Sequence, residues 1–144
     1  MAKLRAANRS CVTAEVALSD KEGSAQFVVA GGLSGLMQHQ SSYNEGRITQ
    51  AQKDNNNVIT VATSTFAKVM EQAQIEAVDF LSIDVEGAEM TILQTLDFDR
   101  FDIASLAIEN NEKTPHLCEF LSGKGYSCLG HLHILDELFV KRRS

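Results

Sequence analysis

The first third of the chain has a strand-like pattern of apolar and polar residues. Residues 12–18 alternate with a period of two, and residues 25–30 form a second run of strand-favouring side chains. Turn-forming residues at 21–23 separate the runs, which predicts a β-hairpin with Gly23 at the bend. Residues 31–57 are rich in glycine and polar side chains, and they predict one long loop, a candidate lid or substrate loop.

From residue 58 onward, strand-like and helix-like segments alternate at the spacing typical of βα units. A short strand at 58–62 precedes a helix that Ser64 can cap. The apolar residues of this helix follow the i, i+3, i+4, i+7 pattern of one buried face, at Phe66, Val69, Met70 and Ala73. Residues 78–85 are almost continuously apolar, which predicts a strand covered on both faces.

A second helix and a second covered strand follow directly. Met90, Leu93 and Leu96 give the helix a buried stripe, and residues 103–108 predict the strand. Because a helical crossover joins the strands at 78–85 and 103–108, we expect these two strands to be parallel neighbours.

The C-terminal part ends the pattern with a third helix and two strands. The Thr-Pro pair at 114–115 suits a helix start, and Gly123 or Gly125 can end that helix. Segments 126–132 and 138–141 predict an antiparallel hairpin at the sheet edge. The whole pattern predicts an α/β fold with a mostly parallel sheet and an antiparallel C-terminal hairpin.

Composition and charge restrict the function classes. The 144 residues have the length of one domain, residues 1–144, and 44% of them are hydrophobic, enough for a core. The net charge of −6 disfavours binding to nucleic acid or to a membrane surface. No apolar stretch approaches the roughly 20 residues of a spanning helix, and no signal region precedes residue 10, so we expect a cytoplasmic protein.

Several familiar motifs are incomplete. The three cysteines, Cys11, Cys118 and Cys128, fit neither a disulfide framework nor a zinc ribbon, and we interpret them as reduced core thiols. His131 and His133 share a strand face without a third ligand nearby. The glycine-rich segment at 31–35 matches no phosphate-binding motif, and no nucleophile elbow supports hydrolase chemistry.

Acidic side chains follow both covered strands. Asp84, Glu86 and Glu89 come after the first strand, and Glu109 and Asn110 come at the end of the second. Ligands of open α/β sheets bind at the carboxyl ends of parallel strands, so we expect these side chains on one edge. Such an edge can bind a cation, orient a hydroxyl or supply a general base.

A structural explanation exists for part of this acidic segment. Glu86 and Glu89 fall in a first helical turn, where the helix dipole favours acidic side chains. Asp84 ends a covered strand, where a carboxylate is costly without partners. Gly87 either lets a ligand approach or eases the turn into the helix.

The segment VDFLSIDVEGAEMTILQTLDF at 78–98 closely resembles the signature of the FkbM-type methyltransferases. EVALSDKEGSAQF before it, and SLAIEN, GKGYSC and ELFVKR after it, resemble the same family in the expected order. The resemblance implies the Rossmann-like class I S-adenosylmethionine-dependent fold, a seven-stranded sheet with one antiparallel strand, and methylation of an oxygen atom. The acceptor would be a small molecule or a sugar hydroxyl.

The resemblance also implies site residues. Leu18, Ser19 and Asp20 would lie near the adenine of S-adenosylmethionine, while Asp84 and Glu86 would line the methyl-transfer end. Because methyl transfer requires removal of the acceptor proton, a nearby carboxylate would take it.

Three carboxylates are candidates for that base, namely Asp84, Glu86 and Glu109. The set of Asp84, Glu109 and Asn110 also resembles the metal ligands of catechol-type O-methyltransferases, which implies a possible Mg²⁺ ion at the acceptor oxygen.

The resemblance begins after the glycine-rich loop that holds the cofactor in this family. It therefore implies a domain that is truncated at its N-terminus, and one version of this hypothesis is that the truncated chain has no activity. The truncation also implies an exposed strand edge at residues 78–85, through which copies of the chain associate. Two alternatives are a non-catalytic interaction module that uses this edge and a metal-dependent enzyme that uses the acidic residues.

Overall fold

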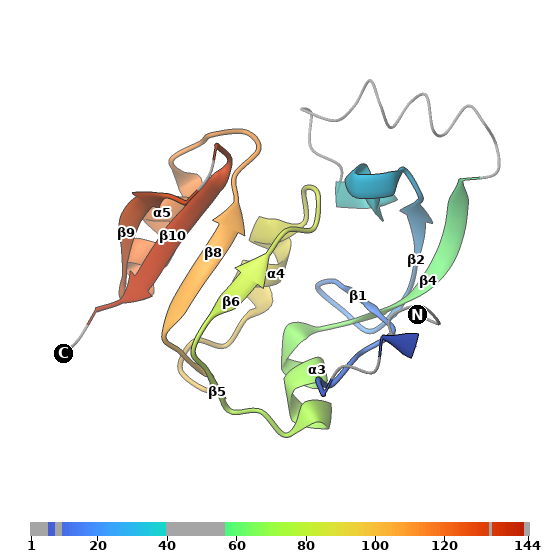
Figure 1. Cartoon of the computed structure of the whole chain (residues 1–144), viewed down its shortest axis with the longest axis horizontal. Coiled ribbons are helices and arrows are strands. Elements are labelled where there is room, and N and C mark those ends of the chain that lie inside the picture. The colour runs from blue at the N-terminus through green and yellow to red at the C-terminus, as the bar shows by residue number, and fades with distance from the viewer. Residues whose placement is uncertain (1–5, 8–9, 40–56, 133, 143–144) are drawn as a thin grey trace.

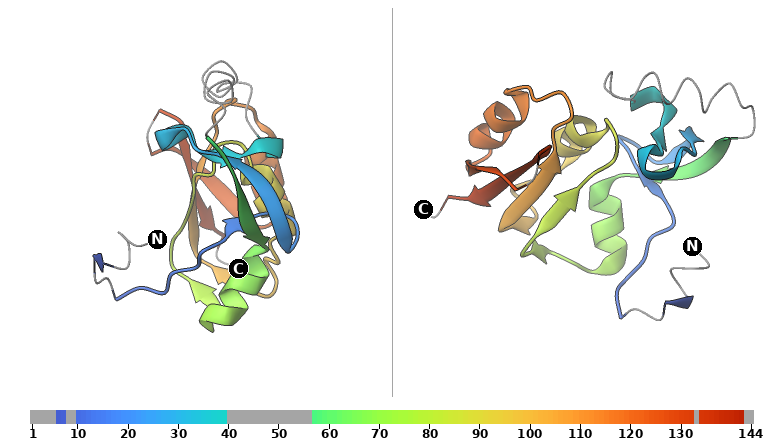
Figure 2. Two further views of the ribbon diagram at one scale, coloured as in Figure 1. Left: turned by 90° about the vertical axis from the view of Figure 1, so that its right-hand side faces the viewer. Right: turned by 45° about the horizontal axis from the view of Figure 1, so that its top comes forward.

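The computed structural model describes residues 6–7, 10–39, 57–132 and 134–142, and these form a mixed α/β structure. Two four-stranded sheets lie side by side, with the earlier strands in one and the later strands in the other (Figures 1 and 2), and residues 77–78 pair with residues 102–103 in a third, two-stranded parallel sheet. In chain order the elements are β1 (Ala17–Leu18), β2 (Gly23–Val28), η1 (Gly31–Leu33), β3 (Gly35–Leu36), η2 (Met37–His39), β4 (Val58–Ser64), α3 (Phe66–Ala73), β5 (Ala77–Val78), β6 (Leu81–Ile83), α4 (Glu89–Thr95), β7 (Asp102–Ile103), β8 (Ser105–Glu109), α5 (His116–Gly123), β9 (Tyr126–His131) and β10 (Asp136–Lys141).

The N-terminal sheet has the order β1-β4-β2-β3, so the predicted hairpin over residues 12–30 is wrong. Strand β4 lies between the two expected partners, parallel to β1 and antiparallel to β2. The sequence pattern indicated strands in the regions of β1 and β2, but it could not show that β4 is the strand that pairs with both. β4 pairs with β2 over its whole length, from Gly23↔Thr63 to Val28↔Val58, which a two-residue β1 cannot match.

The structure describes the first part of the predicted long loop at residues 31–57 and its last residue. Its first part, Gly31 to His39, forms two 3-10 turns around the short strand β3, which pairs with β2. The remainder up to residue 56 lies outside the described residues.

The C-terminal sheet has the order β6-β8-β10-β9. Strands β6 and β8 are parallel, with Leu81 opposite Leu106 and Ile83 opposite Ile108, as the crossover predicted. The predicted C-terminal hairpin is also confirmed, because β9 and β10 are antiparallel. β10, however, pairs with β8 on its other side and so lies inside the sheet rather than at its edge.

The two strands expected to be covered are shorter than predicted. Residues 78–85 contain β5 and β6 with a break at Asp79–Phe80, and β7 and β8 are separated at Ala104. In β6 the side chain of Ile83 is buried, whereas Ser82 is exposed, so coverage on both faces is wrong for this strand. β6 is therefore a strand with one buried face and one free edge within the described sheets.

The helices pack on one common core with the C-terminal sheet. Phe66 and Met70 come from α3, Ile92 and Leu93 from α4, and Leu121 from α5. α3 is capped by Thr65, whose Oγ1 accepts a hydrogen bond from the backbone N–H of Lys68 at 3.2 Å, rather than by the predicted Ser64. No helix in the described part of the chain is long and apolar enough to cross a membrane.

Two of the three cysteines are not the core thiols that the sequence predicted, whereas Cys118 packs against the core. Cys11 and Cys128 are exposed, Cys118 is half-buried, and all three are free. Exposure of Cys128 follows from its position on β9, the last strand of the sheet order.

Candidate functional site

Three carboxylates meet where β6 and β8 end. Asp84 and Glu86 follow β6, Glu109 is the last residue of β8, and one oxygen from each lies within 4.8 Å of the others. Parallel strands explain this meeting, because their carboxyl ends lie at the same edge of a sheet. We call these three residues the acidic rim.

A strained loop positions the acidic rim. Glu86 has a φ of 56° and Gly87 a φ of 114°, so two consecutive residues have left-handed or glycine-type backbone conformations. Such a conformation is costly for a residue with a side chain and easy for glycine. Gly87 thus serves the turn into α4, the second of its two predicted roles.

Glu89 holds this loop in place. Its buried carboxylate accepts hydrogen bonds from the backbone N–H of Val85 at 3.0 Å and from that of Gly87 at 3.0 and 3.1 Å. Charge-assisted bonds of this kind are about twice as strong as neutral ones. Glu89, the first residue of α4, therefore has the structural role that its place in the first turn predicted. The same prediction is wrong for Glu86, which precedes α4 and has a left-handed backbone.

Glu109 is the group in the acidic rim that the surroundings perturb most clearly. Partial burial and the neighbouring charges of Asp84, Glu86 and Glu89 raise the pKa of Glu109 from 4.5 to about 7. A hydrogen bond from Asn111 Nδ2 at 2.6 Å acts in the opposite direction and lowers this pKa. The result is a carboxyl group that exchanges protons near neutral pH.

Asn110 does not join the acidic rim, although it is adjacent in sequence to Glu109. Its side chain is buried, and its Nδ2 donates to Glu137 Oε1 at 3.0 Å and to the backbone carbonyl of Thr114 at 2.9 Å. The predicted ligand set of Asp84, Glu109 and Asn110 is therefore not formed. Successive residues of a strand point to opposite sides, which accounts for the difference.

A cavity of about 270 Å³ opens beside Glu109. Gly87, Met90 and Leu117 contribute to its wall, and His39 reaches it from the N-terminal part of the chain. His39 Nδ1 lies 3.5 Å from Thr91 Oγ1 of α4. Sequence reasoning missed His39, because it sits in a polar segment without any motif; the only signal was the prediction of a substrate loop there.

A family comparison identifies the domain that carries this site. The model of the Methyltransferase FkbM domain matches residues 2–128 of the chain. The chain belongs to the FkbM methyltransferase family. Searches of curated proteins and of solved structures found no match. The resemblance seen in the sequence is confirmed, and β10 lies beyond the matched part of this FkbM domain.

A second cavity of the FkbM domain is lined by two of the residues that the sequence places at the cofactor, Leu18 and Asp84. It also measures about 270 Å³ and is lined by Leu18, Phe27 and Leu36 on apolar sides and by Asp84 at the acidic rim. Leu18 was expected near the adenine and Asp84 at the methyl-transfer end, so the cavity adjoins residues expected at both ends of the cofactor.

The other two residues expected at the adenine lie next to this cavity without lining it. Ser19 is buried, its backbone N–H donates to the Ser64 carbonyl at 2.9 Å, and its hydroxyl donates to Asp20 at 3.0 Å. These two hydrogen bonds fix the end of β1, so Ser19 holds the neighbouring Leu18 in position.

The acidic rim also has the spacing of a divalent-cation site. Three carboxylate oxygens within 4.8 Å of one another can bridge one hard cation, with water completing its shell. The same closeness raises the pKa of Glu109, so a cation and a proton would compete for the same oxygens.

Proposed function

We propose that this FkbM domain is an S-adenosylmethionine-dependent O-methyltransferase in which Glu109 is the general base. The observation that carries the proposal is the acidic rim, where partial burial and neighbouring carboxylates raise the pKa of Glu109 to about 7. A base is most effective when its pKa lies near the working pH. The acceptor that suits this site is a hydroxyl group of a small molecule or sugar.

The arrangement of the C-terminal sheet supports the class I methyltransferase fold. β8 is parallel to β6, and β10 is antiparallel to both β8 and β9. β10 is therefore the one strand of this sheet that runs against the others, as the family's sheet requires. In open sheets of this kind, ligands bind at the carboxyl ends of the parallel strands, which is where the acidic rim lies.

The chain's own residues have two tasks in the proposed reaction. When bound, S-adenosylmethionine supplies an electrophilic methyl group. The ionised Glu109 accepts the proton of the acceptor hydroxyl, and the cavity beside it holds the acceptor against Met90 and Leu117. Glu89 keeps the loop before α4 in the conformation that sets the position of Glu86. Most of the rate gain of such a transfer comes from alignment.

A calorimetric titration of the full chain with S-adenosylhomocysteine tests the cofactor part of the proposal. We expect binding, weakened at least about tenfold in Leu18→Glu because a charge enters the apolar wall. The matched control is Val12→Glu, since Val12 is 70% exposed and lines none of the cavities described here. No binding up to millimolar ligand would contradict the proposal.

The pH dependence of methyl transfer tests the base. We expect the rate with a panel of hydroxyl acceptors to rise with pH through about 7, as Glu109 becomes ionised. Glu109→Gln should remove this rise, whereas Glu76→Gln, an exposed carboxylate outside both cavities, should keep it. A rise that persists in Glu109→Gln would assign the base to another group.

The free edge of β6 supports a second proposal, self-association through that strand. β6 is the outermost strand of its sheet among the described residues, and Phe80 beside it is 52% exposed. Unpaired strand edges and exposed aromatic rings favour pairing with another chain. Light scattering should show a dimer that Phe80→Asp converts to a monomer; a monomeric wild-type chain would reject this proposal.

A further inference from the structure

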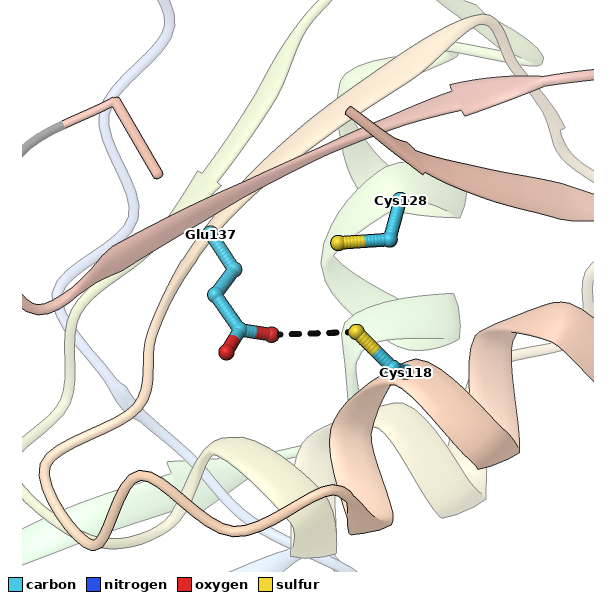
Figure 3. Close-up of side chains that lie close together, drawn as sticks. All are labelled: Cys118, Cys128 and Glu137. Carbon is cyan, nitrogen blue, oxygen red and sulfur yellow. Dashed lines mark hydrogen bonds between the residues drawn. The ribbon is translucent and has the colours of Figure 1, made fainter. Parts of the chain in front are cut away.

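Two cysteines and a glutamate meet close to Asn110, whose Nδ2 donates to the glutamate. Cys118 comes from α5, Cys128 from β9 and Glu137 from β10, and Figure 3 shows the three side chains directed toward a common point. One ligand atom from each lies within 4.8 Å of the others. We call these three residues the sulfur cluster.

The size of the sulfur cluster is close to that of a zinc site. In a tetrahedral site, with Zn–S near 2.3 Å and Zn–O near 2.0 to 2.2 Å, neighbouring ligand atoms are roughly 3.5 to 3.8 Å apart. Cys118 Sγ lies 3.4 Å from Glu137 Oε2, and the third ligand atom is within the 4.8 Å limit. Small side-chain rotations would therefore bring all three atoms to coordination distance.

The carboxylate of Glu137 is placed as a metal ligand would be. It is only 8% exposed, and neither ion pair given by the described residues, Arg100–Glu71 or Lys141–Asp102, involves it. A buried carboxylate without a cation is costly.

One oxygen of Glu137 is already oriented, and the other is available. Asn110 Nδ2 donates to Oε1 at 3.0 Å, while Oε2 receives only the weak thiol donor of Cys118. Metal-binding carboxylates commonly have such a fixing hydrogen bond on the non-ligating oxygen.

We propose that Cys118, Cys128 and Glu137 form a zinc site that cross-links α5 to the β9–β10 hairpin. Two sulfurs and one carboxylate suit Zn²⁺, whereas Mg²⁺ and Ca²⁺ prefer all-oxygen shells. Binding releases both thiol protons: Zn²⁺ plus two thiols and one carboxylate gives a site with net charge −1 and two H⁺. Water takes the fourth position, which the exposed Cys128 leaves accessible to solvent.

A disulfide between the two cysteines is the competing assignment, and the structure favours the metal. A disulfide would use only the two sulfurs and would leave the buried carboxylate with Asn110 as its remaining described hydrogen-bond partner. The metal uses all three ligand atoms and gives the buried carboxylate a cation as its partner. Glu137 lies beyond residue 128, where the family match ends, so the match does not include this third ligand.

Metal titration of the full, reduced chain tests the proposal. Co²⁺ is the probe, because thiolate coordination produces a charge-transfer absorption and tetrahedral geometry produces intense visible bands. We expect one equivalent of Co²⁺ to give both signals, Zn²⁺ to displace it, and zinc to raise the melting temperature of the chain.

Variants show whether these residues are the ligands. Cys118→Ser and Cys128→Ser should each weaken zinc binding roughly 100-fold or more, and Glu137→Gln about tenfold or more. Cys11→Ser is the matched control, because Cys11 is an exposed thiol outside the cluster, and it should bind as the wild type does. Circular dichroism of the metal-free variants verifies folding, and Cys128→Ser, which changes an exposed side chain, keeps the test valid if Cys118→Ser unfolds.

Three results would overturn the proposal. The first is the absence of a thiolate charge-transfer band at one equivalent of Co²⁺. The second is equal zinc affinity in Cys128→Ser and Cys11→Ser. The third combines two observations: air oxidation removes two hydrogens from Cys118 and Cys128, as mass spectrometry would show, and the reduced chain takes up no zinc. Together these would identify the two cysteines as a redox disulfide.

Discussion

The acidic rim and the sulfur cluster each hold a carboxylate beside two further ligand atoms within 4.8 Å, yet their chemistry differs. In the acidic rim, the partly buried Glu109 faces two other carboxylates, and its pKa rises to about 7. In the sulfur cluster, the carboxylate of Glu137 is buried and its neighbours are thiols. Burial and hydrogen bonds with Cys128 and Glu137 raise the pKa of Cys118 to about 12.

The difference shows how the neighbours of a carboxylate determine its use. Like charges in a partly open position favour one shared proton, which makes a base that works near neutral pH. A buried carboxylate among soft sulfur atoms favours a metal ion over a proton acceptor role. Asn110 separates the two sites, because it follows Glu109 in the chain and donates to Glu137.

The largest effect should come from the acidic rim. Glu109→Gln keeps the shape of the side chain but removes the base, so methyl transfer should fall about 100- to 10,000-fold. Zinc uptake by the sulfur cluster should not change. The measurement is the transfer rate at pH 8 with Glu76→Gln as control, and a loss of less than tenfold would contradict the role of Glu109.

Asn110→Ala should destabilise the chain, because Asn110 ties the end of β8 to Glu137 of the sulfur cluster. The change removes three hydrogen bonds, two to Thr114 and one to Glu137, and leaves buried polar groups without partners. We expect a loss of about 2 to 4 kcal/mol in the free energy of unfolding, measured by urea denaturation. Gln94→Ala on the exposed side of α4 is the control. Unchanged stability would mean that these three hydrogen bonds make no net contribution to folding.

The pH dependence of folding should report the raised pKa of Glu109. Since the folded pKa of Glu109 lies above 4.5, the folded chain holds this proton more tightly than the unfolded chain. The stabilising contribution is complete below about pH 4.5 and is lost as the pH rises through about 7.

Glu109→Gln should therefore stabilise the chain at pH 8 and not at pH 4.5. The gain should be about 1 to 2 kcal/mol, less than the full shift implies, because solvent screens this partly exposed group. Urea denaturation at both pH values measures it. Equal effects at the two pH values would show that the carboxylate neighbours do not perturb Glu109.

Sequence reasoning succeeded where topology determines position. The ends of two parallel strands must lie at one edge, so Asp84 and Glu109 could be grouped from the pattern alone. The same reasoning placed Asn110 beside them, which is wrong, because its side chain bonds to Glu137. The sulfur cluster could not be predicted, because its residues come from a helix and two strands with no local spacing rule. The pairing of β4 between β1 and β2 was missed for the same reason, since strand patterns do not name partners.

The smallest effect should come from Asn111, the only described hydrogen-bond donor shown to Glu109. Its amide lowers the pKa of that carboxyl, so Asn111→Ala should move the midpoint of the pH–rate profile upward. One such bond is worth about 0.5 to 1.5 kcal/mol, which corresponds to a shift of about 0.4 to 1 pH unit. Zinc affinity should stay the same, because Asn111 does not contact Glu137. A downward shift would mean that Asn111 stabilises the protonated carboxyl, and the acidic rim would then resemble a proton donor more than a base.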